Sequence, residues 1–249
     1  MFIDTHCHLF PEYYEDLDSL EKTILDAKIV KVINNGTDNQ SNCMVLDLIK
    51  KYDYMYGAIG IHPEVVDTYK EDDIDFVEKH LKDNKIVALG EIGLDYYWTK
   101  DNKEKQIELF EKQLAIAEKF DIPVIVHSRD ATLDTIECLK KYKVRGVIHS
   151  FSGSYETAQI YIKMGFLLGI NGVVTFKNCN LIDVLKRISI ENIVLETDSP
   201  YLTPVPFRGQ QNNPSHVIDT AKFVADNLGI DLEKLSLITQ NNVKRVFDI

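Results

Sequence analysis

The sequence predicts an α/β protein, a TIM (β/α)8 barrel, on three observations. Short apolar segments alternate with amphipathic segments along the chain, which is the pattern of a parallel sheet whose strands are joined by helices. Eight strand-like segments occur, and 249 residues is the size of one such barrel. A G-x-G-x-x-G or P-loop pattern would favour the alternative, an open doubly wound sheet, and the chain has neither pattern.

Each expected strand is a short apolar run, and each expected helix has apolar residues at spacings of three and four, as Ile107, Phe110, Leu114 and Ala117 do. The strands are expected at residues 2–5, 31–34, 55–59, 86–89, 124–127, 146–149, 166–170 and 193–197. The helices are expected at residues 17–27, 39–51, 73–82, 103–120, 131–141, 156–164 and 181–187, followed by a helical tail from Ser215 in two pieces.

No Gly/Ser-rich or Pro-rich linker divides the chain, so residues 1–249 are expected to form a single domain. Prolines concentrate at residues 200–214, which predicts an irregular loop after the last strand. No apolar run approaches the roughly 20 residues of a membrane span, and no signal peptide pattern opens the chain. The four cysteines lie far apart without a C-x-x-C pair, as in reduced proteins, so a cytoplasmic protein without membrane contact is expected.

The formal net charge of -11 argues against a protein that coats long nucleic acid, because duplex binding relies on many lysines and arginines. The charge does not exclude a nuclease. Metal ions can supply positive charge at one phosphate, and a short strand end needs few contacts.

Polar residues collect where the expected strands end. In a barrel of this kind, the active site lies at the carboxyl ends of the strands. Five of the seven histidines fall there, whereas His80 and His216 are expected to be ordinary helix residues. The residues at the strand ends are His6, His8, His62, Glu91, His127, His149 and Asp198.

These residue types indicate a metal site. His6 and His8 alternate on one face of the first strand, and with a carboxylate they suit one cation. Asp198 can complete that group, because the last strand of a closed barrel neighbours the first. His127 and His149 suit a second cation, and Glu91 can lend one oxygen to each metal and so bridge them.

Three residues close to the candidate ligands in sequence are not expected to bind the metals themselves. Asp4 and Glu196 each lie two residues before a candidate ligand and are candidates for orienting the imidazoles. Cys7 should point to the opposite face of its strand and is not proposed as a ligand.

Six motifs follow one another along the chain: residues 2–8 (FIDTHCH), 60–63 (GIHP), 90–95 (GEIGLD), 123–129 (PVIVHSR), 149–153 (HSFSG) and 195–202 (LETDSPYL). With these motifs the chain resembles the TatD family of metal-dependent deoxyribonucleases, within the amidohydrolase superfamily. The resemblance covers nearly the whole chain, in order. It extends to Arg208-Gly209, Asn212, Pro214 and the terminal residues 242–247.

The resemblance implies a distorted TIM barrel with two divalent cations, Mg, Mn or Zn, whose identity the sequence leaves open. It implies phosphodiester hydrolysis, often from a DNA 3′ end, with single-stranded ends as the partner. His62 and Arg208 match family positions near the scissile phosphate. The ligands that it implies are His6, His8, Glu91, His127, His149 and Asp198.

One departure from the family concerns the loop after the last strand. The family commonly has basic residues after Arg-Gly, whereas Arg208-Gly209 is followed here by Gln210 and Gln211. With the charge of -11, this predicts weak, local DNA binding. Lys177 and Arg129 are the remaining basic candidates for substrate contact at the rim.

The expected mechanism is hydrolysis by a water that both metals activate, with Asp198 as general base and Glu91 as bridging ligand. Arg208 and His62 would stabilise charge on the phosphate oxygens. Two alternatives stay open: an amidohydrolase or aminoacyl-ester hydrolase using the same two metals, and a non-catalytic barrel that binds a partner through its rim. Exonuclease or endonuclease action and the oligomeric state also stay open.

Overall fold

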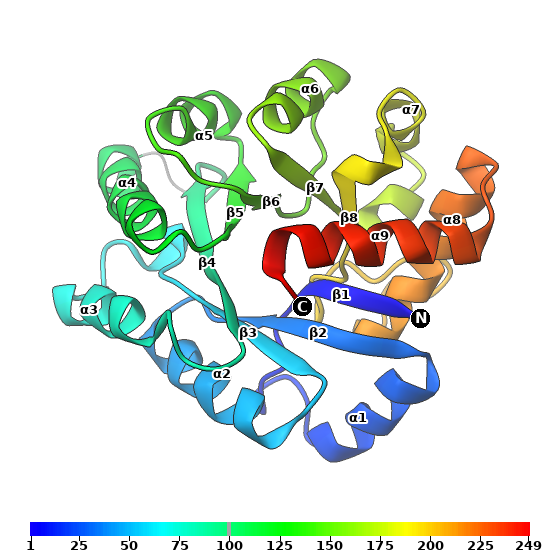
Figure 1. Ribbon diagram of the computed structural model, residues 1–249, viewed down its shortest axis with the longest axis horizontal. Coiled ribbons are helices and arrows are strands. Elements are labelled where there is room, and N and C mark those ends of the chain that lie inside the picture. The colour runs from blue at the N-terminus through cyan, green and yellow to red at the C-terminus, as the bar shows by residue number, and fades with distance from the viewer. Residues whose placement is uncertain (99–100) are drawn as a thin grey trace. The chain divides into compact units, whose positions relative to one another are not determined.

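The computed structural model describes residues 1–98 and 101–249 (Figure 1). Within them, eight parallel β-strands alternate with α-helices along the chain, which is the TIM-type (β/α)8 fold that the sequence predicts. The chain divides into two compact units: the first comprises Met1–Asn34 and Ser150–Ile249, and the second comprises Asn35–His149.

The strands are β1 (Phe2–Cys7), β2 (Ile29–Asn35), β3 (Met55–Ile59), β4 (Ile86–Asp95), β5 (Val124–Arg129), β6 (Gly146–Ile148), β7 (Phe166–Ile170) and β8 (Ile193–Leu195). The helices are α1 (Leu17–Asp26), α2 (Asn39–Lys51), α3 (Glu71–His80), α4 (Lys103–Phe120), α5 (Thr132–Leu139), α6 (Tyr155–Lys163), α7 (Leu181–Leu185), α8 (Val217–Leu228) and α9 (Leu232–Phe247). Short 3₁₀ helices form at Pro63–Val65, Gly172–Thr175, Ile190–Asn192 and Pro214–His216.

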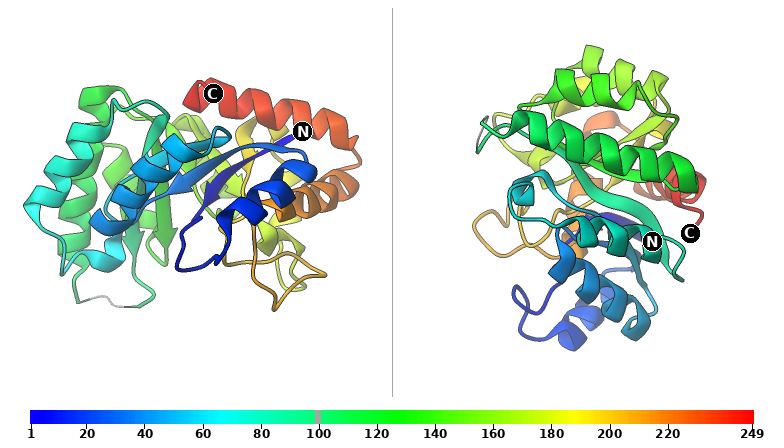
Figure 2. Two further views of the ribbon diagram at one scale, coloured as in Figure 1. Left: turned by 90° about the horizontal axis from the view of Figure 1, so that it is seen from below. Right: turned by 90° about the vertical axis from the view of Figure 1, so that its left-hand side faces the viewer.

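In the first unit, the end of β1 lies beside the segment that follows β8. β1 pairs in parallel with β2, and β7 pairs in parallel with β8. A further parallel bridge joins Cys7 to Ser199. The C-terminal helices α8 and α9 pack against both β1 and β8, as the helix α9 beside β1 in Figure 2 illustrates. Residues near the two ends of the chain are therefore brought together.

In the second unit, β3, β4, β5 and β6 form a parallel sheet in chain order. Helix α2 packs on β3, and α4 packs on β4. The apolar run of α4 explains this contact, because Phe110 and Leu114 are fully buried, as is Leu89 of β4. Burial of such side chains is the main stabilising contribution of a parallel sheet covered by helices.

Every expected strand and helix forms, and apart from the end of β4 each end either matches the prediction or differs from it by one or two residues. The largest difference is β4, which was expected to end at Leu89 but continues to Asp95. Gly93 allows this extension. Its φ is +144°, and a Cβ atom there would lie 1.9 Å from the carbonyl oxygen of His127. Only glycine permits β4 to pair with β5 at this point.

Side-chain caps fix where several helices begin. Asp38 accepts a hydrogen bond from the backbone N–H of Ser41, and the Ser41 hydroxyl bonds back to the Asp38 N–H, which forms a capping box at α2. Asp16 caps α1 by accepting a hydrogen bond from the backbone N–H of Ser19, and Asp231 caps α9 by accepting from the backbone N–H groups of Glu233 and Lys234. Gly229, in the left-handed conformation, ends α8 and makes the expected break in the tail.

All four cysteines are free thiols, and Cys7 and Cys138 are buried. Among the described residues, no helix combines the length and the apolar composition that crossing a bilayer would need.

Candidate metal centre

The first unit brings His6, His8 and Asp198 together. His6 is on β1, His8 follows β1, and Asp198 follows β8. Backbone pairing sets their relation: the Asp198 N–H donates to the His6 carbonyl at 2.9 Å, and the His8 N–H donates to the Ser199 carbonyl at 2.7 Å. Asp198 has a φ of 56°, a left-handed conformation that turns the chain directly after β8.

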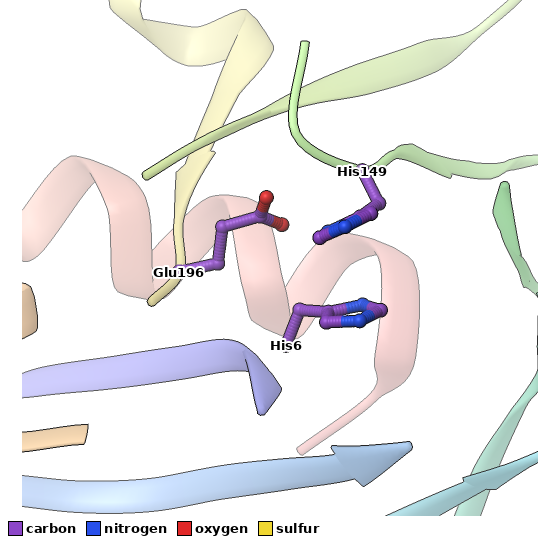
Figure 3. A group of neighbouring side chains, drawn as sticks. All are labelled: His6, His149 and Glu196. Carbon is purple, nitrogen blue, oxygen red and sulfur yellow. The ribbon is translucent and has the colours of Figure 1, made fainter. Parts of the chain in front are cut away.

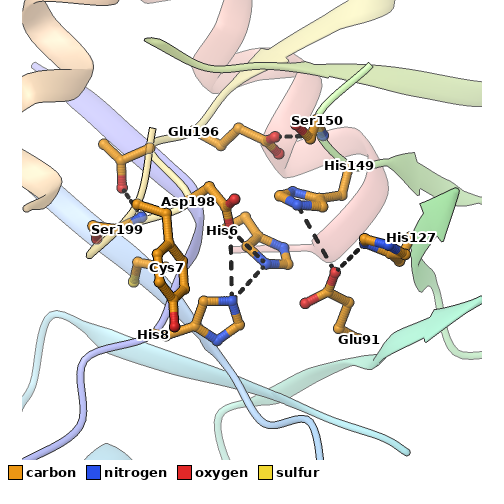
Figure 4. A network of polar contacts seen from close by, with 12 residues as sticks. His6, Cys7, His8, Glu91, His127, His149, Ser150, Glu196, Asp198 and Ser199 are labelled. Carbon is orange, nitrogen blue, oxygen red and sulfur yellow. Dashed lines mark hydrogen bonds and ion pairs between the residues drawn. The ribbon is translucent and has the colours of Figure 1, made fainter. Parts of the chain in front are cut away.

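The three side chains point one donor atom each toward a common point (Figure 4). The Nε2 atoms of His6 and His8 lie 3.2 Å apart, and each lies 3.6 Å from Oδ1 of Asp198. Bonds of about 2.0–2.2 Å in a tetrahedron place neighbouring ligand atoms about 3.4 Å apart. Two imidazoles and a carboxylate at these separations fit a divalent cation.

Asp4 is not one of the three candidate ligands, but it holds the backbone around them. Its carboxylate accepts hydrogen bonds from the backbone N–H groups of His6, at 3.2 Å, and Thr197, at 2.9 Å, and from the Thr197 hydroxyl. Burial raises the pKa of Asp4 to about 8, against the lowering effect of these bonds. Asp4 thus ties β1 to the segment that carries Asp198.

Glu196 lies beside His6 in the same unit, with ligand atoms of the two side chains within 4.8 Å of each other (Figure 3). Its Oε1 accepts a hydrogen bond from the backbone N–H of Ser150 at 2.6 Å. Room for the carboxylate comes from Gly169, where a Cβ atom would lie 2.2 Å from Oε2 of Glu196. A side chain at position 169 would therefore displace Glu196.

The second unit brings the other candidate ligands around Glu91, which is buried near the end of β4. His127 Nδ1 lies 2.9 Å from Glu91 Oε1 (Figure 4). His62 Nε2 and His149 Nε2 lie 3.6 and 3.8 Å from the same oxygen. The group of His62, Glu91 and His127 has donor atoms within 4.8 Å of one another, which suits a cation. His62, expected near the substrate, is thus also a candidate ligand.

Asp95 holds the far side of the His127 ring, and the sequence analysis had assigned it no role. His127 Nε2 lies 2.9 Å from Asp95 Oδ2. A carboxylate on the second ring nitrogen is the usual support of a metal-binding histidine, because it fixes the tautomer and the ring orientation. The signal was present in the sequence, since Asp95 ends the same segment that contains Glu91.

The two carboxylates also set the charge of His127. Burial alone would lower the pKa of His127, but hydrogen bonds with Asp95 and Glu91 raise it to about 9. Burial would raise the pKa of Asp95, yet its hydrogen bond with His127 holds that pKa below the usual value. Because an imidazole binds a cation only when it is neutral, a cation at Nδ1 would replace a proton while Nε2–H keeps Asp95.

Two buried glutamines of α4, which were not predicted from the sequence to have a role, hold the backbone next to these residues. Gln113 bonds to both backbone groups of Ile61, its Oε1 accepting from the N–H at 2.8 Å and its Nε2 donating to the carbonyl at 2.9 Å. Gln106 bonds in the same way to both backbone groups of Asp95. The available signal was a polar residue repeated at i and i+7 on the apolar face of the helix.

The basic candidates for substrate contact are exposed. The Arg208 guanidinium lies 4.1 Å from the ring centroid of Phe176, the residue before Lys177 in the sequence. Arg129 ends β5, two residues after His127. His80 and His216 pair with Asp83 and Asp219, and neither belongs to a candidate metal group among the described residues.

Clustered imidazole and carboxylate donors at the strand ends of a TIM-type fold define a class, the metal-dependent barrel hydrolases. A family model described as "TatD related DNase" matches residues 3–248. The chain therefore belongs to the TatD-related DNase family, and it is a TatD-type metal-dependent hydrolase.

Known proteins are similar to this chain over their full length. The uncharacterized metal-dependent hydrolase YabD of Bacillus subtilis is 39% identical, with 100% of both chains covered. The uncharacterized metal-dependent hydrolase YcfH of Escherichia coli is 34% identical, over 99% of this chain and 96% of the relative. The crystal structure of YJJV, a TatD homolog from Escherichia coli, has a TM-score of 0.94 at 29% identity and covers 100% of this chain and 98% of that one.

Proposed function

We propose that this chain is a metal-dependent deoxyribonuclease that hydrolyses phosphodiester bonds at single-stranded DNA ends, removing nucleotides from the 3′ end. The observation that carries the proposal is the convergence of His6 Nε2, His8 Nε2 and Asp198 Oδ1 at 3.2–3.6 Å in a chain of the TatD-related DNase family. This donor set suits a divalent cation, and the family supplies the substrate class.

We assign the cations to the clusters as follows. His6, His8 and Asp198 would hold one cation, and Glu91, His127 and His149 would hold a second, with His62 beside them. The bridging role of Glu91 and the number of two cations stay predictions from the sequence. Bound divalent cations would lower the pKa of a coordinated water and neutralise charge on the phosphate.

The chain's own groups would carry the remaining chemistry. Asp198 would accept the proton of the attacking water at a carboxylate oxygen, as a general base. Arg208 and Lys177 in the first unit, and Arg129 in the second, would contact phosphate oxygens. With so few basic contacts and a net charge of -11, the DNA would be held weakly, at one end, and released after each cleavage. We propose that the protein acts in the cytoplasm.

The experiment that tests this function digests an end-labelled single-stranded oligonucleotide with the full-length protein under Mg, Mn and Zn in turn. Product lengths are resolved over time. We expect a ladder that shortens from the 3′ end. Scattered products at early times would instead assign an endonuclease, and a duplex cleaved as fast as the single strand would contradict the preference for single-stranded ends.

A matched set of other substrates separates the alternatives. Aryl amides, lactones and an aminoacyl ester are assayed under the same metal conditions as the oligonucleotide. Turnover of one of these with no cleavage of any oligonucleotide would replace the nuclease with an amidohydrolase or an aminoacyl-ester hydrolase. Bound metal without turnover of any ester or amide would instead favour a non-catalytic barrel.

A further inference from the structure

Three exposed side chains gather at the adjoining ends of β4 and β5, beside the Glu91 and His127 cluster. They are Tyr97, Trp98 and Arg129, called here the aromatic platform. Tyr97 is 54% exposed, and Trp98, the one tryptophan of the chain, is 67% exposed. Burial of tryptophan and tyrosine rings is energetically favourable. Two such rings left exposed to solvent at a strand end are therefore available to bind a ligand.

The platform is a built feature of the sheet. Arg129 lies opposite Asp95 in the register of β4 and β5, and the Tyr96 N–H donates to the Arg129 carbonyl at 2.9 Å. The Arg129 guanidinium carbon lies 3.7 Å from the ring centroid of Tyr97 and 5.6 Å from that of Trp98. The two rings stand edge to face, with centroids 4.8 Å apart at 85°.

The guanidinium of Arg129 makes no ion pair among the described residues, whereas Arg145 is paired with Asp121 at 2.5 Å. The charge of Arg129 acts on the Asp95 carboxylate without forming an ion pair with it. Stacking on Tyr97 uses the face of the guanidinium and leaves its N–H groups, which lie in its plane, able to donate to an anion. The platform therefore offers π-faces and a cation side by side.

One carboxylate links the platform to the candidate metal group. Asp95 Oδ1 accepts a hydrogen bond from the Tyr97 N–H at 2.9 Å, and Asp95 Oδ2 lies 2.9 Å from Nε2 of His127. Through Asp95, the backbone of the platform is therefore tied to His127, one of the candidate metal ligands. This position distinguishes the platform from Tyr155 and Arg187, which stack at 3.6 Å and belong to no candidate metal group in the part of the chain that the structure describes.

We propose that the aromatic platform stacks an unpaired nucleobase of the substrate while Arg129 donates to an adjacent phosphate. This inference rests on the proposed function and narrows its substrate class to single strands, because in a duplex the base faces are already covered by their neighbours. Every base has a π-face, so the platform would accept all four with little preference. Stacking would also supply affinity in a chain whose acidic residues outnumber its basic ones.

The test uses the fluorescence of Trp98, which reports on the platform directly because the chain has no other tryptophan. The Mg-loaded full-length protein is titrated with a single-stranded hexathymidylate whose phosphorothioate linkages resist cleavage. A strand of the same length and charge without bases is titrated in parallel. We expect quenching that saturates with the thymidylate and little change with the abasic strand. Equal responses to both strands would overturn the proposal, because phosphate alone would then account for binding.

Variants separate stacking from charge. Trp98→Ala, followed by anisotropy of a labelled strand, should weaken binding roughly tenfold, and Trp98→Phe should restore most of it. Arg129→Gln should weaken binding and reduce quenching. Arg187→Gln is the matched control, since it removes the same charge from a similar stack elsewhere, and it should leave binding unchanged. If Arg187→Gln and Arg129→Gln weakened binding equally, the proposal would fail, because general charge would explain the effect.

Cleavage assays on the same variants distinguish the two proposals. DNA cleavage whose KM is unchanged in Trp98→Ala would overturn the platform and leave the nuclease assignment standing. Quenching by the thymidylate without cleavage under any metal would support the platform and remove the nuclease assignment. Absence of both quenching and cleavage would overturn both.

Discussion

Two roles are predicted for the side chain of Asp198, as a ligand and as a base. Its Oδ1 lies 3.6 Å from the Nε2 atoms of both His6 and His8, and its backbone N–H is bonded to the His6 carbonyl. The carboxylate would therefore complete the candidate cation group and would be placed to accept a proton from a water bound there. A substitution that keeps its shape but removes its charge would separate position from chemistry.

We predict that Asp198→Asn lowers the single-turnover rate of oligonucleotide cleavage by about 10²–10⁴-fold, because a general base contributes that factor. The amide keeps the size of the side chain, so the far-UV circular dichroism spectrum should not change. Asp219→Asn is the matched control, since Asp219 pairs with His216 outside the candidate groups, and it should cleave at the wild-type rate. Wild-type activity in Asp198→Asn would remove Asp198 from the mechanism.

The pKa values of the buried cysteines predict the order in which the thiols react with an alkylating reagent. Burial raises the pKa of Cys138 to about 12, and it raises the pKa of Cys7 as well, whereas Cys43 is exposed. Only the thiolate reacts, and a raised pKa keeps the thiol protonated until the solution is strongly alkaline. At about pH 8, iodoacetamide should therefore modify Cys43 first and leave Cys138 and Cys7 intact until the protein unfolds. Mass spectrometry of peptides checks the order, and equal labelling of Cys138 and Cys43 in the native protein would contradict it.

At the scale of single residues, sequence reasoning located the candidate ligands but not all of their supports. His6, His8 and Asp198 are brought together as expected, and so are Glu91, His127 and His149. Their roles as ligands stay predictions. Asp95, Gln106 and Gln113 were missed because their tasks depend on contacts between elements, and a position in the sequence does not reveal which side chain or backbone group of another element a residue will meet.

Among the elements, α4 is the one that connects the fold to the second candidate group. Its apolar face packs on β4, and Gln106 and Gln113 on that face bond to the backbones at Asp95 and Ile61. A single helix thus fixes the residue before His62 and the end of the strand that carries Glu91. Each glutamine satisfies one buried donor and one buried acceptor.

We predict that Gln113→Leu lowers the free energy of unfolding by roughly 2–4 kcal/mol, because the N–H and the carbonyl of Ile61 lose their partners while Gln113 is fully buried. Urea denaturation measures the change. The control is Glu108→Leu, an exposed position on the same helix, where the change should stay within about 0.5 kcal/mol. Equal losses in both variants would show that the backbone bonds of Gln113 contribute nothing specific.

The periodicity of apolar residues was enough to predict where the strands and helices lie. Where some of them end depends on tertiary contacts. The strands β3 and β7 and the helices α2 and α4 have the predicted bounds. β4 was predicted too short because its glycines and Glu91 look like a loop in sequence. Close approach of two backbones at Gly93 and His127 makes that segment a strand, and such an approach is a property of the pair, not of either sequence.

For the whole molecule, the alternation of strands and helices was enough to predict the fold class. The structure confirms the TIM-type fold. The expectation of one domain over residues 1–249 stays a prediction, because the chain divides into two compact units. Trp98 lies in the second unit, whereas backbone circular dichroism reports on both, so the two signals together test it.

We predict one cooperative transition on heating, with the same midpoint by Trp98 fluorescence and by circular dichroism. A cation at 100 times its dissociation constant stabilises the native state by about 2.7 kcal/mol. For a protein of this size, a chelator should therefore lower the midpoint by roughly 5–10 °C. Transitions that separate would contradict the single domain, and a midpoint unchanged by the chelator would contradict cation binding by the native state.

The central claim is that this chain hydrolyses DNA with cations held by its His and carboxylate clusters. The most direct measurement is the rate of cleavage of an end-labelled single strand by metal-stripped protein as one cation at a time, Mg, Mn or Zn, is added back. We predict no cleavage before addition and a rate that rises and saturates with at least one cation. Cleavage that persists without metal, or none with any of the three, would contradict the claim.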